Sequence, residues 1–150
     1  MSHHQAILLA TLAGALACAG RASTGDDTGP QQFTRQLSAT PAQVVAATVE
    51  TFADYEIPVA TANEVEGEVR SGPITIASGG AYSPESDRVV CSAAAVAGEE
   101  GRAPRMSLTV RTQRADGGSR VQLSAEGPCN LTSGFITELL DQIEERATNR

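Results

Sequence analysis

The residue types that usually perform nucleophilic and acid-base catalysis are scarce in this chain. Its only histidines are His3 and His4, and it contains no lysine. Serine, cysteine and lysine nucleophiles depend on a neighbouring base or on a lowered pKa, which a chain without histidine or lysine after residue 4 cannot supply in the usual way. We therefore expect no catalytic residue, and we expect that the protein is not an enzyme.

One group of carboxylates has a spacing that suits a cation. Glu64, Glu66 and Glu68 occupy alternate positions, and alternate side chains of a strand lie on one face, where they could hold a hard cation such as Ca²⁺. A solvated edge strand protected by its charges has the same pattern, and we favour that interpretation. Gly79 and Gly80 lack the lysine and the glycine spacing of phosphate-binding loops. The sequence therefore predicts no metal site and no cofactor.

The N-terminal segment has the features of an export signal. Ile7 to Ala17 is an apolar run that is too short to span a bilayer, and it ends in small residues of the kind that a signal peptidase requires. The junction before Cys18 resembles a bacterial lipobox, in which the cysteine becomes the lipid-modified N-terminus. We predict a signal peptide at 1–17, a lipidated cysteine with a flexible tether at 18–30, and a folded domain at 31–150. The protein would then be anchored by lipid in the bacterial envelope, facing the periplasm; the alternative is a soluble periplasmic or secreted protein.

The other two cysteines, Cys91 and Cys129, are expected to form a disulfide. An exported protein with three cysteines has one left over if two of them pair, and the odd one here is Cys18. Cys91 and Cys129 also share the parity of the residues expected to point into the core. The alternative is a pair of buried free thiols.

Composition limits the possible classes of protein. The chain has 150 residues, of which 41% are hydrophobic, so it can form one domain with a core, although only 3% are aromatic. Its formal net charge is −7, and it has no block of positive charge that could follow a phosphate backbone. We expect no nucleic-acid partner, contact with the membrane through the N-terminal lipid only, and envelope proteins as partners.

Periodicity and turn residues predict an α+β domain. Thr40 to Gln43 combine a capping hydroxyl, a proline at the first helical position and a glutamine three residues after the cap, which predicts a helix from Pro41 to about Ala53. A second helix is expected after Thr132 or Ser133. The expected strands are 31–37, 57–63, 67–76 with a break at Pro73, 88–96, 105–114 and 119–126. The resulting order is β-α-β-β-β-β-β-α in a single domain, with a curved antiparallel sheet packed on helices.

This order resembles the helix-grip folds, in which a curved antiparallel sheet wraps a C-terminal helix. The stretches SATPAQVVAATVETFADYEIPV, EGEVRSGPI and CNLTSGFITELLDQI look like parts of small bacterial envelope lipoproteins. They are similar to the helix-grip domains of the lipoprotein accessory of the outer-membrane β-barrel assembly machine. The resemblance implies an envelope lipoprotein of binding or structural type, and it carries over no catalytic residue.

The expected working surface combines a loop with a strand. The loop from Ala77 to Asp87 is long for a connection between neighbouring strands, and Tyr82 with Arg88 would suit polar and stacking contacts. Glu66 and Glu68 on the neighbouring strand complete the candidate interaction surface. We expect a structural or protein-interaction module without catalysis; the alternative is a carrier of a small apolar ligand held between the C-terminal helix and the sheet.

Overall fold

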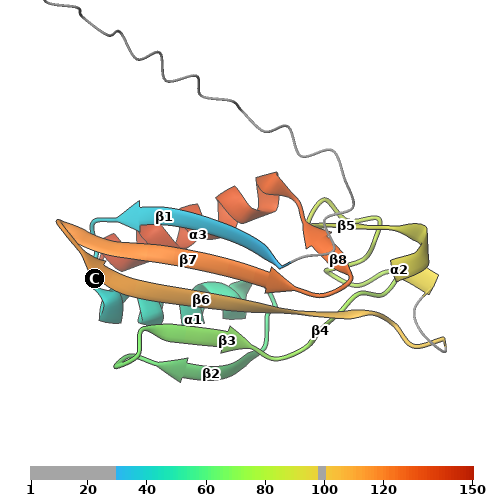
Figure 1. Cartoon of the computed structure of the whole chain (residues 1–150), viewed down its shortest axis with the longest axis horizontal. Helices are drawn as coiled ribbons and strands as arrows, with labels where there is room; N and C mark the ends of the chain where they lie inside the picture. Colours follow the sequence, from blue (N-terminus) through green and yellow to red (C-terminus); the bar gives the residue numbers. More distant parts are fainter. Residues whose placement is uncertain (1–29, 98–100) are drawn as a thin grey trace, which may run out of the picture.

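The computed structural model describes residues 30–97 and 101–150 as one α+β domain. Its main sheet is antiparallel, with the strand order β1-β7-β6-β3-β2, and Figure 1 shows it face on. These strands are β1 (Gln31–Leu37), β2 (Val59–Asn63), β3 (Glu68–Ser71), β6 (Arg105–Ala115) and β7 (Gly118–Glu126). A short strand, β4 (Ile74–Thr75), pairs with the start of β6. The predicted signal peptide, Cys18 and the tether up to residue 29 lie outside the described residues.

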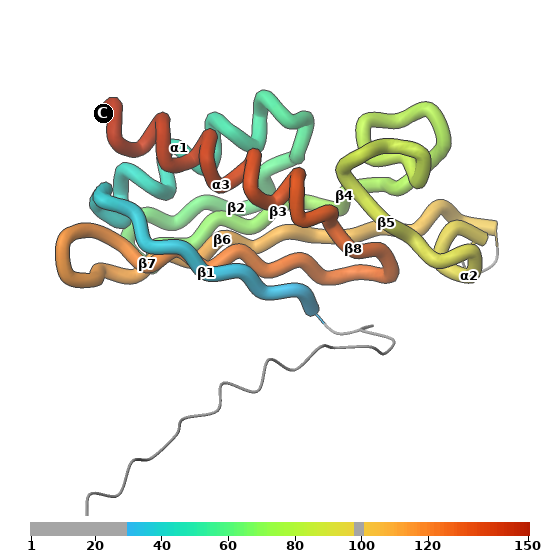
Figure 2. Tube along the Cα trace, turned by 90° about the horizontal axis from the view of Figure 1, so that it is seen from above, coloured from blue at the N-terminus to red at the C-terminus, as the bar shows by residue number. Residues whose placement is uncertain are grey.

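Two long helices cover one face of this sheet, as Figure 2 shows. They are α1 (Pro41–Asp54) and α3 (Ser133–Thr148). At the start of α1, Thr40 and Gln43 form the predicted capping box, and Thr132 accepts a hydrogen bond from the Phe135 N–H at the start of α3. No helix among the described residues is long and apolar enough to cross a bilayer.

The α1 helix ends in a backbone motif that usually needs glycine. The Ile57 N–H donates to the Phe52 carbonyl, and the Glu56 N–H donates to the Ala53 carbonyl. These two bonds define a Schellman motif, whose residue after the helix cap is left-handed. Here that residue is Glu56, with φ of 56°, the one positive φ outside glycine in the described chain. The α1 helix therefore ends before Pro58, and the backbone of Glu56 is strained at this end.

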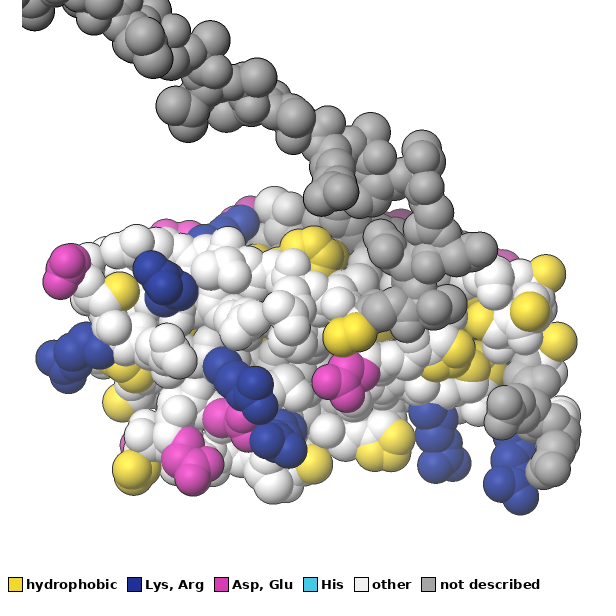
Figure 3. All heavy atoms as spheres, viewed as in Figure 1, with side chains coloured by type: hydrophobic (Ala, Val, Ile, Leu, Met, Phe, Trp, Pro, Cys, Tyr) yellow, Lys and Arg dark blue, Asp and Glu magenta, His cyan; other side chains and the backbone are white. Residues whose placement is uncertain are grey.

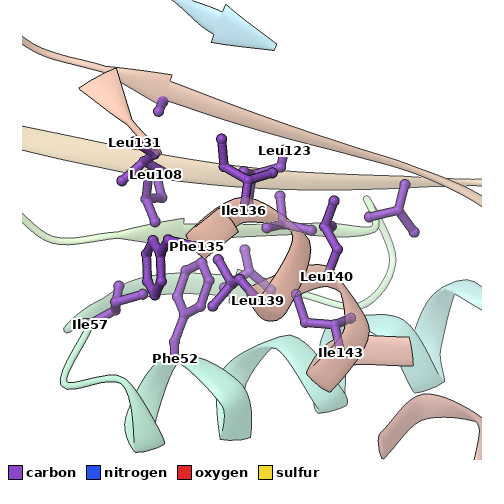
Figure 4. Close-up of a cluster of buried hydrophobic side chains, with 14 of the residues drawn as sticks. Phe52, Ile57, Leu108, Leu123, Leu131, Phe135, Ile136, Leu139, Leu140 and Ile143 are labelled. Atoms are coloured by element: carbon purple, nitrogen blue, oxygen red, sulfur yellow. The ribbon is translucent and has the colours of Figure 1, made fainter. Parts of the chain in front are cut away.

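The core lies between the sheet and the two helices. Figure 4 shows side chains of α3 between α1 and the strands. Leu139 and Ile143 of α3, Phe52 of α1, and Leu108 and Leu123 of the sheet have essentially no exposed surface. Because aromatic residues are few, aliphatic side chains from alternate strand positions fill most of this layer.

A second, two-stranded sheet joins the region before α3 to the loop region. It consists of β5 (Val89–Cys91) and β8 (Cys129–Leu131), and Cys91 lies opposite Cys129 in the register. The two cysteines form a disulfide with a Cα–Cα distance of 4.5 Å, which confirms the predicted pairing. The disulfide does not belong to the main sheet, because β5 and β8 pair only with each other among the described strands.

The predicted fold class is confirmed: the chain is a single α+β domain with a curved antiparallel sheet packed against helices in a helix-grip arrangement. The strand predicted at 88–96 is wrong in its second half, where α2 (Ala93–Ala97) forms. Alanine has the highest helix propensity, and Ser92 accepts a hydrogen bond from the Ala95 N–H at the start of this turn. The predicted break at Pro73 separates β3 from β4.

Candidate functional site

The two parts of the predicted interaction surface lie on different sides of the molecule. Tyr82 and Arg88 pack against the helices, whereas Glu68 lies on β3 with the outward parity of the opposite face of the sheet. Figure 2 shows the segment between β4 and β5 on the helix side.

Arg88 is surrounded by three aromatic rings. Its guanidinium carbon lies 5.4 Å from the ring centre of Tyr55, 5.3 Å from that of Tyr82 and 5.5 Å from that of Phe135. The rings of Tyr55 and Tyr82 each meet Phe135 edge to face, with centres 5.5 Å and 5.9 Å away. A guanidinium in such a position is attracted to the negative faces of the rings. The cluster joins the end of α1, the loop and the first turn of α3.

Hydrogen bonds fix the two tyrosines of this cluster. The Tyr82 hydroxyl donates to the Tyr55 carbonyl at 2.7 Å, and the Tyr55 hydroxyl donates to Glu138 at 2.7 Å. Burial, followed by the hydrogen bond to Glu138, raises the pKa of Tyr55 to about 12. Burial also raises the pKa of Tyr82 to about 12, against the opposing effect of Arg88. Both phenols are therefore protonated at neutral pH and act as donors.

The loop from Ala77 to Asp87 packs against the rest of the domain through Tyr82, as does Arg88 directly after it. Tyr82 is only 4% exposed, so its ring offers no exposed stacking surface of the kind the sequence suggested. Thr132 donates from its hydroxyl to the Asp87 carbonyl and from its N–H to the Arg88 carbonyl. The residue that caps α3 thus also anchors the end of the loop. Local sequence gave no sign of this, because the ring packs on residues distant in the chain.

The other face of the main sheet is not covered by any described helix or loop (Figure 2). On this face Glu68 receives hydrogen bonds from Nε of Arg70 at 2.5 Å and from Nε of Arg111 at 2.6 Å. The bond to Arg70, and then the bond to Arg111, holds the pKa of Glu68 below its usual value. A carboxylate held by two guanidinium groups is already neutralised, so Glu68 serves to position the two arginines.

A hollow of about 340 Å³ lies beside this pair of bonds on the open face. Its lining residues are Thr34, Arg111, Gln113, Arg120 and Gln122. Strand register brings them together, since Gln122 lies opposite both Thr34 and Arg111, and Arg120 lies opposite Gln113. No carboxylate among the described residues lies within salt-bridge distance of Arg120. The lining thus offers guanidinium and amide donors without an acidic residue.

The three alternating glutamates do not share a strand face. Glu64 and Glu66 are exposed in the turn between β2 and β3, and only Glu68 belongs to a strand. Asn63 shapes this turn by accepting hydrogen bonds from the N–H groups of Val65 and Glu66. Glu66 therefore lies in the turn and Glu68 on the open face of β3, although only one residue separates them in the sequence.

Several acidic residues of the helices have arginine partners on the helix side. Arg35 of β1 binds Asp141 of α3 at 2.5 Å. Arg146 of α3 binds Asp54 of α1, and Arg150 binds Glu50. These exposed pairs hold the helices to each other and to the edge of the sheet, each with a small stabilising effect.

No known protein family matches the chain, and no curated protein matches its sequence. Solved structures with a similar course of the chain include Ara h 8.0201, at 14% identity and a TM-score of 0.48, covering 81% of this chain and all of that one. Protein CV1439 from Chromobacterium violaceum has 12% identity and a TM-score of 0.42, with 80% and 94% covered. TTHA0849 from Thermus thermophilus has 18% identity and a TM-score of 0.41, with 81% and 98% covered.

Proposed function

We propose that this protein is an exported, lipid-anchored module that binds another envelope protein through the open face of its sheet. The observation that carries the proposal is the hollow at Arg111 and Arg120, in which Arg111 is paired with Glu68 and Arg120, without an acidic partner among the described residues, presents positive charge in a chain of net charge −7. Guanidinium groups bind carboxylates in a planar, directional way. The partner chemistry that fits is an exposed segment rich in aspartate or glutamate.

Export is supported by the disulfide between Cys91 and Cys129. Disulfides persist in the periplasm and outside the cell, where thiols are not kept reduced. Lipid attachment at Cys18 is supported by the sequence before it, in which an apolar run ends at small residues.

The packing of the core favours protein binding over carriage of a small apolar ligand. Ala93 and Ala94 lie exposed in α2 and leave no room in the helix-sheet layer, in which Ala125 and Ala147 are buried. The layer itself is filled by large side chains such as Phe52 and Leu139, which are fully buried. A binding role without catalysis also agrees with a described chain that has neither histidine nor lysine.

Anchoring is tested by mass spectrometry of the protein extracted from membranes. The expected N-terminus is a lipid-modified Cys18, and Cys18→Ser should move the protein from the membrane fraction to the soluble fraction. An unmodified chain that begins at or after residue 18 would contradict the anchor and leave a soluble exported protein.

The binding face is tested by a photo-crosslinking residue placed at Gln113, with one at Glu145 of α3 as the control. Both positions are exposed, but only Gln113 lines the hollow. We expect a discrete crosslinked protein from Gln113 alone, whose crosslinked peptide is acidic. Arg120→Glu should abolish that crosslink, whereas the same charge change in Arg114→Glu, outside the hollow, should retain it. Equal crosslinking from both positions, or indifference to Arg120→Glu, would contradict the proposal.

A further inference from the structure

An uncharged apolar segment is exposed at one end of the molecule. Residues 89–97 contain no charged side chain, and α2 within them has no buried residue. Val90 is 60% exposed and Val96 is 44% exposed. In Figure 3, hydrophobic side chains gather at the end where Figure 1 places α2. Single exposed apolar residues are ordinary, but this grouping in one short segment indicates a contact surface.

The chain enters the domain beside β8, nearer to α2 than to the β6–β7 turn (Figure 1). The Gln31 side chain accepts a hydrogen bond from the Leu131 N–H at 2.7 Å and donates one to the Leu131 carbonyl at 3.3 Å. Leu131 in turn lies opposite Val89 in the pair of β5 and β8. The first residue of the domain is thus joined through β8 to the strand that leads into α2.

The chain between the predicted anchor at Cys18 and the start of β1 at Gln31 has a limited reach. Cys18 and Gln31 are separated by thirteen peptide units, which span at most about 45 Å when fully extended. An anchor at Cys18 would therefore allow the end that carries α2 to reach the lipid, with the β6–β7 turn at the opposite end farther away (Figure 1).

We propose that the apolar patch formed by Val90, Ala93, Ala94, Val96 and Ala97 rests on the bilayer to which the protein is anchored; this inference rests on the lipid anchor of the proposed function. Residues 89–105 contain Glu99 and Glu100 against Arg102 and Arg105, so their formal charges cancel. Apolar contact, and not charge, has to hold the segment to lipid. The contact is too small to bind alone, but an anchor raises its effective concentration enough for a weak contact to form.

The test uses the acylated, mature protein in vesicles of phosphatidylethanolamine and phosphatidylglycerol, with a fluorophore on a cysteine introduced by Ala94→Cys. The matched position is Asp116→Cys in the β6–β7 turn, which is also exposed and lies at the other end. Nitroxide-labelled lipids should quench the fluorophore at residue 94 and leave the one at residue 116 unchanged. The quenching should persist at high salt, because the segment has no net charge.

A second set of variants separates lipid contact from disturbance of the fold. Val96→Asp should reduce quenching at residue 94 while the protein still floats with the vesicles, and Val65→Asp, at a valine that is 98% exposed in the β2–β3 turn, should change nothing. Protein that fails to float would show that the anchor itself is wrong. Protein that floats but shows equal quenching at residues 94 and 116 would overturn the docking inference and leave the anchor intact.

Discussion

The guanidinium of Arg88 lies 5.3 Å from the ring centre of Tyr82, and this contact attaches an otherwise irregular loop to the ends of two helices. Replacing Arg88 by alanine removes the cation from three rings at once. We expect Arg88→Ala to lower the free energy of unfolding by about 1 to 2 kcal/mol, measured by urea denaturation. Hydrogen exchange should also become faster between residues 77 and 88.

Arg114→Ala is the control for this variant. Arg114 is exposed and has no ion pair among the residues that the structure describes, so the substitution should change stability by less than about 0.5 kcal/mol. Equal effects of the two substitutions would show that the aromatic contacts of Arg88 contribute nothing specific.

The two tyrosines of the chain predict an unusual alkaline titration. Both have a pKa of about 12 in the folded protein, mainly because of burial, against about 10 in an unfolded chain. Since the folded pKa is the higher one, the stability linked to these groups is complete below pH 10. It is lost as pH rises from about 10 to about 12. Ultraviolet absorbance should show almost no ionised tyrosine at pH 10 in the folded protein, and half ionisation at pH 10 after denaturation. Half ionisation of the native protein at pH 10 would contradict the buried cluster.

Glu56 predicts a stabilising substitution. Its φ of 56° suits glycine, which has no Cβ to oppose a left-handed backbone. We expect Glu56→Gly to raise the free energy of unfolding by about 0.5 to 1 kcal/mol, seen as a higher denaturation midpoint. Glu56→Ala, which removes the same carboxylate but keeps a Cβ, should give no such increase. If alanine stabilises as much as glycine, the charge and not the backbone conformation is responsible.

Because of the disulfide, we expect the free energy of unfolding to depend strongly on redox conditions. Cys91 and Cys129 close a loop with a sequence separation of 38 residues. Loop-closure entropy for this length corresponds to about 3 to 4 kcal/mol. The double variant Cys91→Ser/Cys129→Ser should therefore unfold at much lower denaturant concentration, and reduced wild type should match it. Two reactive thiols in the unfolded, unreduced protein would mean that the bond is absent.

Local signals in the sequence predicted the elements that local physics controls. The capping box at Thr40 and Gln43 predicted the start of α1, and the gap between the predicted strands 105–114 and 119–126 matches the turn between β6 and β7. Ala93 to Ala97 misled the prediction, because small residues with apparent alternation also form helix readily. The strand β8 has three residues and depends on its partner β5, so no local pattern could reveal it.

The candidate sites were harder to predict because they depend on contacts between distant residues. Glycine and serine around Tyr82 suggested an exposed loop, yet the ring packs on Phe135. One signal was available: only 3% of the residues are aromatic, and burial of each large ring contributes much apolar area to the core. The hollow at Arg111 and Arg120 depends on the register between neighbouring strands. The alternating pattern predicts which residues share a face of one strand, but it does not predict which residues of two strands lie opposite each other.

The pairing of β1 with β7 would have a consequence for the proposed export of the chain. Gln31 pairs with Ala125, so β1 pairs with a strand, β7, that lies more than 80 residues later in the chain. Such long-range contacts form slowly, because the loop between them must close first. A chain that crosses a membrane from its N-terminus would leave β1 unpaired until residues 119–125 emerge. If the chain is exported as proposed, residues 31–125 would therefore have to cross the membrane before the domain can fold.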